Sequence, residues 1–198
     1  SLLSAYWNGA ATYYRGLLHA LAARGHDITF YEPDAFDRQA HRDIEPPDWA
    51  RVVVYEATPA ALRRAVEEGS GADLLVKASG VGIFDAELEA AVLAARPPGA
   101  LAVFWEVDAP ATLDAIARSP SHHLRALVPR YDMVMTYGGG QPVVDAYRAL
   151  GARDCVPVYN ALDPATHHPV PRRAVREAHL TFLGYRPAPP GAPRRQFF

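Results

Sequence analysis

Cysteine and lysine are nearly absent from this sequence. Cys155 is the only cysteine, which excludes a disulfide framework and a metal site built from several thiolates. The longest apolar runs, such as Leu101–Trp105, are far shorter than the roughly 20 residues of a membrane-spanning helix. A net charge of -2 provides no positive field for nucleic acid or an anionic membrane. We therefore expect no nucleic-acid partner, no membrane span and, by default, a cytoplasmic location.

The sequence also lacks the short motifs of several enzyme classes. It contains no GxGxxG fingerprint, phosphate-loop lysine, nucleophile elbow or HExxH helix, which argues against a nicotinamide or flavin oxidoreductase above all. The histidines include two adjacent pairs, His122-His123 and His167-His168. Because neighbouring side chains point apart on a helix or strand, we expect solvated histidines and no metal site.

Short apolar runs alternate with longer helical patterns along most of the chain. This order is typical of a parallel sheet covered by crossover helices, and it predicts an α/β fold. Leu101–Trp105 has no polar interruption, so we expect it to be the central strand, buried on both faces. The other expected strands are the end of a first strand at Ser1–Ser4, then Ile28–Tyr31, Arg51–Tyr55, Leu74–Ala78, Tyr131–Tyr137 and Asp154–Val158. Helices are expected at Tyr13–Arg24, Thr58–Glu68, Asp85–Ala95, from Asp108 onward, and at Gln141–Leu150.

The last part of the sequence has a different composition. Proline recurs between Asp163 and Arg195, which is typical of an extended linker, although residues 179–183 look like a strand. We therefore predict a domain at residues 1–160, an interdomain linker at 161–178, and the start of a truncated C-terminal domain at 179–198. We also expect Ser1 to follow a trimmed beginning.

Four loops are expected at the carboxyl ends of the strands, where open parallel sheets bind ligands. The first contains Trp7, Asn8 and Gly9; the glycine permits a tight turn, and the helix beyond it offers free N–H groups. An ordinary turn with Trp7 in the core is an equally good interpretation. The second loop follows Lys77, whose charge could neutralise a carboxylate or phosphate. We favour a lysine that extends to solvent at the strand terminus.

The third loop contains Glu106 and Asp108, which lie on the same side of an extended segment. Either carboxylate could accept a proton from a substrate hydroxyl or bind sugar hydroxyls. We favour Asp108 as the N-cap of the following helix, and the role of Glu106 stays open. The fourth loop is Gly138–Gly140, which suits a backbone cradle for phosphate or sugar or a turn that needs positive φ.

The order of these segments resembles the CgeB-like glycosyltransferases, the spore-maturation-protein relatives whose N-terminal half precedes a glycosyltransferase group 1-type domain. The resemblance covers nearly the whole chain. The segments that carry it are Trp7–Gly9, Thr12–Glu32, Ala40–Asp43, Phe104–Thr112, Pro129–Asp132, Tyr137–Gly140, Tyr159–Pro164 with His168-Pro169, Leu180–Arg186 and Arg194–Phe198.

The resemblance implies a Rossmann-like, doubly wound parallel sheet that forms the N-terminal domain of a GT-B enzyme. It implies a nucleotide-sugar donor bound mostly by the second domain, an acceptor bound by this domain, and neither a metal nor another cofactor. Trp7, Asn8, Gly9, the Glu106–Asp108 turn and Gly138–Gly140 would line the interdomain cleft. This half alone is expected to be inactive. A non-catalytic domain that binds a nucleotide or sugar remains the alternative.

Overall fold

The structure is a computed structural model that describes residues 1–6, 9–161, 163–164, 168–169 and 171. The chain divides into two compact units, Ser1–Thr166 and His167–Phe198. Most of the predicted linker, and all of the predicted second-domain start at 179–198, lies outside the described residues. Within the described ranges, no helix has both the length and the apolar character needed to cross a bilayer.

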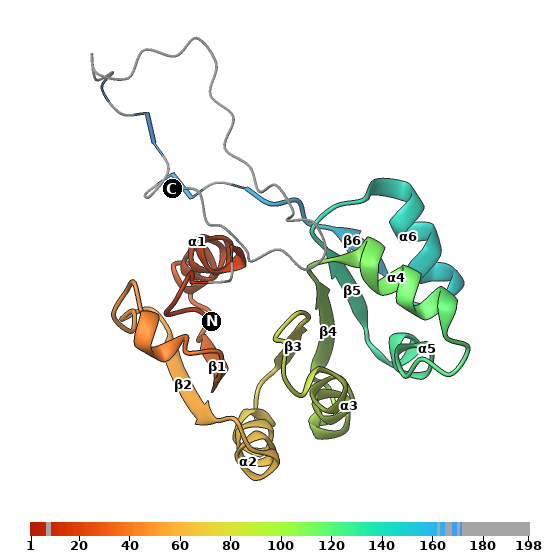
Figure 1. Ribbon diagram of the computed structural model, residues 1–198, viewed down its shortest axis with the longest axis horizontal. Coiled ribbons are helices and arrows are strands. Elements are labelled where there is room, and N and C mark those ends of the chain that lie inside the picture. The colour runs from red at the N-terminus through yellow and green to blue at the C-terminus, as the bar shows by residue number, and fades with distance from the viewer. Residues whose placement is uncertain (7–8, 162, 165–167, 170, 172–198) are drawn as a thin grey trace, which may run out of the picture. The chain divides into compact units, whose positions relative to one another are not determined.

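The first unit contains parallel strands in two sheets, as Figure 1 shows. The smaller sheet pairs β1 (Thr29–Asp34) with β2 (Arg51–Glu56). The larger sheet has the order β3 (Leu74–Ala78), β4 (Leu101–Glu106), β5 (Met133–Thr136) and β6 (Cys155–Pro157). Every assigned pairing is parallel, which confirms the predicted α/β fold.

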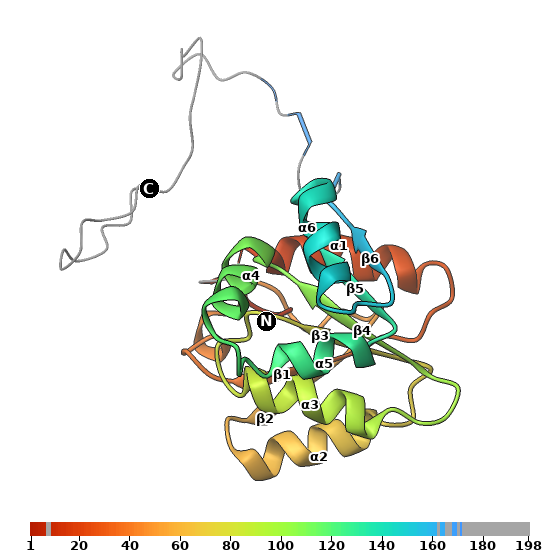
Figure 2. The same cartoon turned by 90° about the vertical axis from the view of Figure 1, so that its right-hand side faces the viewer.

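Helices cover the two faces of the sheets unequally (Figures 1 and 2). Helix α1 (Ala10–Ala22) packs on the face that carries Trp105. The opposite face is covered by α2 (Pro59–Gly69), α3 (Asp85–Ala95), α4 (Ala109–Arg118), α5 (Leu124–Leu127) and α6 (Gly140–Ala149). Two 3₁₀ turns occupy Gln39–His41 and Val128–Arg130. Cover on both faces is the arrangement of a Rossmann-like sheet.

Strand β4 is the interior strand that the sequence predicts. It pairs with β3 on one side and β5 on the other. Its residues from Ala102 to Glu106 are all buried, and only Leu101 at its start is exposed. A run without polar interruptions is therefore buried on both faces of a parallel sheet, as expected.

The predicted strand end at Ser1–Ser4 is wrong in one respect: the segment is buried but forms no strand. Its backbone bonds to a loop instead of a ladder, because the Leu3 carbonyl accepts from the N–H groups of Asp43 and Ile44. The Leu2 N–H donates to a carboxylate oxygen of Glu32 at 2.6 Å. An apolar pattern predicts burial, whereas a strand also requires a neighbouring edge within hydrogen-bonding reach.

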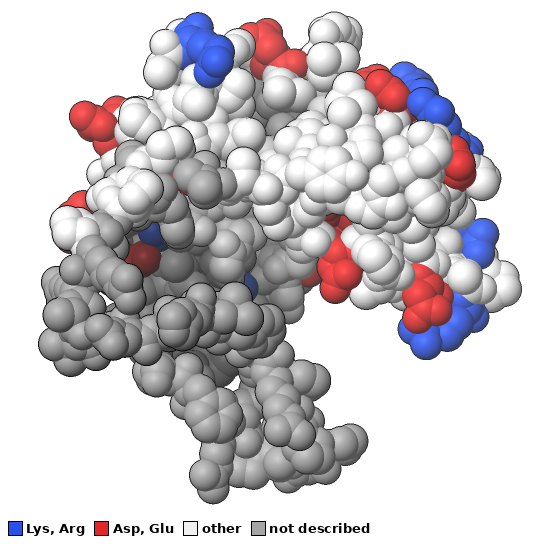
Figure 3. All heavy atoms as spheres, turned by 90° about the horizontal axis from the view of Figure 1, so that it is seen from above, with Lys and Arg blue, Asp and Glu red and all other residues white. Residues whose placement is uncertain are grey.

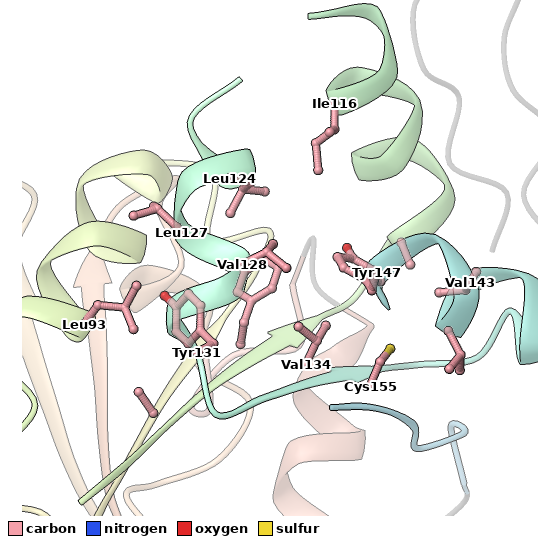
Figure 4. Close-up of a cluster of buried hydrophobic side chains, with 14 residues drawn as sticks. Leu93, Ile116, Leu124, Leu127, Val128, Tyr131, Val134, Val143, Tyr147 and Cys155 are labelled. Atoms are coloured by element: carbon pink, nitrogen blue, oxygen red, sulfur yellow. The ribbon is translucent and has the colours of Figure 1, made fainter. Parts of the chain in front are cut away.

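The two faces of the larger sheet have different cores. The core beneath α3–α6 is mainly aliphatic, and Figure 4 shows Leu124, Val134 and Tyr131 within it. The Tyr131 hydroxyl donates to the Glu89 carbonyl at 2.7 Å. The core beneath α1 is aromatic and contains Tyr14 and Trp105, whose ring centroids are 5.3 Å apart.

Polar atoms in the aromatic core lack hydrogen-bond partners. In the described part of the chain, the hydroxyl of Tyr13 and the indole nitrogen of Trp105 are buried and unpaired, and the buried hydroxyls of Tyr14 and Tyr137 have only each other, without ordinary hydrogen-bond geometry. Burial raises the pKa of Tyr14 to about 12. The neutral phenol is therefore strongly preferred in this core, and an ionised one would be costly.

These two cores predict opposite effects for the same substitution. Tyr131→Phe should lower the free energy of unfolding by about 1 kcal/mol, because it leaves the Glu89 carbonyl unpaired. Tyr14→Phe should leave stability unchanged or raise it, because the Tyr14 hydroxyl is buried and faces only the Tyr137 hydroxyl, without ordinary hydrogen-bond geometry. Urea unfolding at neutral pH measures both. A Tyr14→Phe loss as large as that of Tyr131→Phe would show that the Tyr14 hydroxyl is paired in solution.

The same substitution should change the response to alkaline pH. A tyrosine ordinarily ionises near pH 10, whereas folded Tyr14 keeps its proton to about pH 12. The stability that this neutral phenol contributes is present below pH 10 and is lost as the pH rises toward 12. The Tyr14→Phe chain should therefore lose stability less steeply over that range.

Candidate functional site

The candidate site lies where the winding direction of the sheets reverses. Leu2 packs in one cluster with Phe30 of β1 and Ala78 of β3. The strands β1 and β2 follow one another away from this segment on one side, and β3, β4, β5 and β6 follow one another away from it on the other side. A reversal of this kind is where open parallel sheets bind ligands, outside the carboxyl ends of the strands.

The loops that follow four strands meet at this carboxyl edge. Ser79, after β3, donates its hydroxyl to Glu106 at the end of β4 at 2.8 Å. The glycine turn after β5 lies against the ring of Tyr159, which follows β6. Helix α1 begins at the same edge, since its Tyr13 ring contacts Tyr137 with centroids 4.9 Å apart. The structure thus brings the described loops together, whereas Trp7 and Asn8 lie outside the described residues.

Glu106 is buried, with 1% of its surface exposed. One carboxylate oxygen accepts from the Ser79 hydroxyl and from the Asp108 N–H, each at 2.8 Å. The other accepts from the Tyr147 hydroxyl of α6 at 3.3 Å. Burial, and then the Glu106 carboxylate, raises the pKa of Tyr147 far above its ordinary value, so this phenol stays protonated and can donate. Glu106 therefore holds three segments together.

Asp108 has the opposite environment. It occupies the N-cap position of α4, but its side chain makes no capping hydrogen bond, so the favoured capping interpretation is wrong. Its φ of -140° and ψ of 61° aim the backbone away from ordinary helix-cap geometry. The residue is exposed. Of the two carboxylates in this turn, Asp108 is the one that a substrate can reach.

The glycine turn uses backbone conformations that other residues rarely adopt. Gly139 and Gly140 have φ values of 88° and 58°. A Cβ on Gly139 would lie 2.2 Å from a methyl carbon of Val143, so no side chain fits there. No side chain caps the N-terminus of α6, which begins at Gly140. Consecutive backbone N–H groups in such a turn suit phosphate or polar oxygen atoms.

Gly9 precedes α1 and leaves open space around itself. Its φ is -60°, and a Cβ built there would have no atom of the described residues within 4 Å. Thr12 donates its hydroxyl to the Gly9 carbonyl at 3.2 Å. We expected Gly9 to permit a tight turn, but its φ of -60° is one that any residue can adopt. The glycine leaves room for a ligand beside the backbone instead.

Lys77 does not extend to solvent, so the favoured interpretation of this residue is wrong. Only 3% of it is exposed, and its Nζ donates to the Ala78 carbonyl at 2.8 Å and to Asp85 at 2.7 Å. Glu89 lies 3.7 Å away. Asp85 also accepts from the N–H of Gly82 at 2.7 Å, so the ion pair fixes the loop after β3. We leave this lysine out of the binding surface.

The adjacent histidines also differ from expectation. The rings of His122 and His123 do not point apart; they stack with centroids 4.6 Å apart. His123 pairs with Glu89 at 2.5 Å, and burial followed by the charge of His123 lowers the pKa of His122. Among the described residues, no group of three His, Cys, Asp or Glu side chains is arranged to hold a metal ion. His167 lies outside them.

Two concavities of the chain lie away from this edge. One concavity of about 500 Å³ lies at the amino ends of β1 and β2, and another of about 410 Å³ lies between α2 and α3. Neither is lined by a predicted site residue. On the face visible in Figure 3, acidic and basic side chains are scattered and form no continuous basic area.

The two carboxylates of the β4 turn predict different stability effects. Glu106→Ala should cost about 2–4 kcal/mol, because it leaves the Ser79 and Tyr147 hydroxyls without their acceptor and opens a cavity. Asp108→Ala should cost at most about 1 kcal/mol, through the lost charge at the start of α4. Chemical unfolding gives both values. Equal losses would contradict the different roles assigned to the two residues.

The glycine turn offers a second comparison. Gly139→Ala should destabilise the chain by about 1–3 kcal/mol through its positive φ, and further through contact with Val143. Gly9→Ala should cost less than about 1 kcal/mol. The double variant Gly139→Ala/Val143→Ala removes the contact with Val143 but keeps the unfavourable φ, and it also loses the packing of the Val143 side chain. Thermal melting of the unchanged chain and these three variants tests this. A Gly139→Ala variant that melts like the unchanged chain would refute the positive φ at this position.

Comparisons with known proteins add no family assignment to this geometry. No protein-family model matches the sequence, and no curated protein matches it either. The fold and the arrangement of side chains at the carboxyl edge are therefore the basis for assigning a function.

Proposed function

We propose that this chain is the acceptor-side half of a nucleotide-sugar-dependent glycosyltransferase with a GT-B architecture. One observation carries the proposal: an exposed carboxylate, Asp108, and a glycine turn with positive φ values follow neighbouring strands at the reversal point of a Rossmann-like sheet. The resemblance of the sequence to the CgeB-like glycosyltransferases supports it. The donor would be a sugar linked to a nucleoside diphosphate.

In this proposal, Asp108 acts as the general base. The acceptor hydroxyl attacks the anomeric carbon of the donor, its oxygen forms the new glycosidic bond, and the proton passes to the carboxylate. The bond to the nucleoside diphosphate breaks, and the leaving group takes the electron pair. The Asp108 side chain is exposed and makes no capping bond, so it is available for a proton.

Glu106 is assigned a positioning role in this reaction. Its carboxylate is buried and accepts the Asp108 N–H, which fixes the backbone on which the proposed base is carried. Gly138–Gly140 would bind sugar or phosphate oxygens through backbone N–H groups. The proposed reaction also needs a second surface to cover the bound substrate. A second domain would provide that surface on closure.

A non-catalytic sugar- or nucleotide-binding domain is the second candidate. We expected three charged residues at this edge, but Glu106 and Lys77 are buried and only Asp108 of the three is exposed. This small number of accessible charged groups favours binding without catalysis. Backbone groups and one carboxylate are sufficient to bind hydroxyls without any reaction. Turnover distinguishes the two functions, because only the enzyme releases nucleoside diphosphate.

The test uses the full-length product of the gene that encodes this chain, with a panel of nucleotide sugars and release of nucleoside diphosphate as the readout. We expect turnover by that protein and none by the 198-residue chain alone. Asp108→Asn should lower turnover by about 10²–10⁴-fold. Asp114→Asn, in the exposed Asp114–Arg118 pair of α4, is the matched control and should keep full activity.

Two results would contradict this mechanism. Full turnover by Asp108→Asn would remove this residue from the reaction. If the protein binds a sugar or nucleotide but releases nucleoside diphosphate from none of the donors in the panel, the non-catalytic domain is favoured. Calorimetric titration of the same compounds separates that outcome from an absence of binding.

A further inference from the structure

Two aromatic side chains at the carboxyl edge are exposed. Phe36, which follows β1, is 52% exposed, and Tyr159, which follows β6, is 63% exposed. Among the described residues, these are the exposed members of the phenylalanine, tyrosine and tryptophan side chains. Exposed aromatic rings therefore occur at the edge where the candidate site lies.

The backbone presents Phe36 in a conformation that is rare for its residue type. Phe36 and Asp37 have φ values of 57° and 58°, in the left-handed region that favours glycine. Such conformations are costly and are concentrated at functional sites. Because the Phe36 ring is exposed, its burial on folding does little to offset this cost. The strain and the exposure together point to a role for the ring outside the folded core.

Contacts on one side hold the Phe36 ring in place. The Arg38 guanidinium lies 5.0 Å from the ring centroid, and it donates to the Val81 carbonyl at 3.2 Å. Arg38 itself is buried. A Cβ on Gly82 would lie 3.1 Å from the ring, so the ring lies directly against the glycine backbone. The ring is thus oriented before any ligand arrives.

Tyr159 lies on glycine backbone in the same way. A Cβ on Gly138 would lie 3.2 Å from its ring, and a Cβ on Gly140 would lie 3.8 Å from its hydroxyl oxygen. The glycine turn after β5 therefore supports this ring as well as offering its own backbone groups. Both exposed rings lie against glycine and leave surface open to a ligand.

The two rings flank the turn that carries Asp108. Phe36 lies against the loop after β3, Tyr159 lies against the turn after β5, and β4 pairs with both strands. A Cβ on Gly80, in the first of these loops, would lie 3.0 Å from the Val107 side chain. Two strand spacings, about 10 Å, separate β3 from β5, which is longer than a single sugar ring.

The charges beside the rings favour a neutral, hydroxyl-rich ligand. Asp34 and Asp37 lie on either side of Phe36 in the sequence, and both are exposed, as Asp108 is. Carboxylates accept hydrogen bonds from hydroxyls and repel phosphate. Aromatic rings pack against flat apolar surfaces, such as the C–H face of a sugar ring. Rings and carboxylates together therefore suit a glycan.

We propose that Phe36 and Tyr159 are two sugar-stacking positions that bind a glycan of at least two units across the Asp108 turn. Each ring packs on the apolar face of one sugar, while Asp37 and Asp108 accept hydrogen bonds from its hydroxyls. That this glycan is the acceptor of a transfer reaction rests on the proposed function. Its binding does not require that reaction.

The variant Phe36→Gly separates binding from folding. It removes the ring and relieves the left-handed φ, so the melting temperature of the 198-residue chain should stay the same or rise. Leu74→Ala is the matched control, because Leu74 is 51% exposed at the opposite, amino end of β3. A Phe36→Gly melting temperature lower by about 4 °C or more would overturn the proposal, because the ring would then be part of the core.

Binding is measured by calorimetry on the same chain with neutral glycans of one to five units. The panel contains α- and β-linked glucose oligomers and oligomers of galactose, mannose and N-acetylglucosamine. At least one series should bind more tightly at two units than at one. Phe36→Gly and Tyr159→Ala should each weaken that binding by about 10-fold, whereas Phe36→Tyr and Leu74→Ala should leave it unchanged.

Three results of the calorimetry would overturn the proposal: no binding of any glycan in the panel, equal affinity for one and two units in every series, or full affinity in Phe36→Gly. The proposed transfer reaction can fail separately. Ring-dependent binding without nucleoside diphosphate release by the full-length gene product would contradict the reaction and leave this inference standing. Nucleoside diphosphate release with an unchanged KM for the acceptor in Phe36→Gly would contradict this inference alone.

Discussion

The hydrogen bonds of the Glu106 carboxylate determine the shape of the candidate site. They join the loop after β3, the turn after β4 and Tyr147 of α6. A buried carboxylate requires such donors, since an unpaired charge in this position would be very costly. The same interaction that fixes the turn also removes Glu106 from contact with solvent. Stability and reactivity are therefore divided between two acidic residues two positions apart.

The sequence predicted the elements well where glycine or proline marks their ends. The ranges Leu74–Ala78 and Asp85–Ala95 were predicted without error, because a glycine-containing loop follows the first and Pro97-Pro98 follows the second. The site was predicted less well. Lys77 and Glu106 follow strands as expected, but their partners, Asp85 and Tyr147, come from other elements. Local patterns identify which residues reach an edge, whereas long-range pairing decides which of them remain exposed.

Ser1–Ser4 shows the same limit for secondary structure. Its apolar residues predict burial, and Leu2 and Leu3 are buried. Strand formation depends on neighbours distant in sequence, and the segment bonds to Glu32 and to the loop at Asp43 instead. The winding reversal also lies here, and the segment leads directly into the loop at Gly9, so its hydrogen bonds hold one side of the candidate site.

The charges at the carboxyl edge favour a neutral ligand over a nucleoside diphosphate. Cationic side chains strengthen the binding of a diphosphate, yet Lys77 is buried against Asp85 and Arg15 is paired with Asp43 at 2.6 Å. The described part of the edge offers backbone N–H groups, which suit either ligand, and the carboxylate of Asp108, which would repel phosphate but can bind hydroxyls. A sugar or another hydroxyl compound fits this combination. The acceptor, rather than the activated donor, is therefore the substrate that we assign to this half of the proposed enzyme.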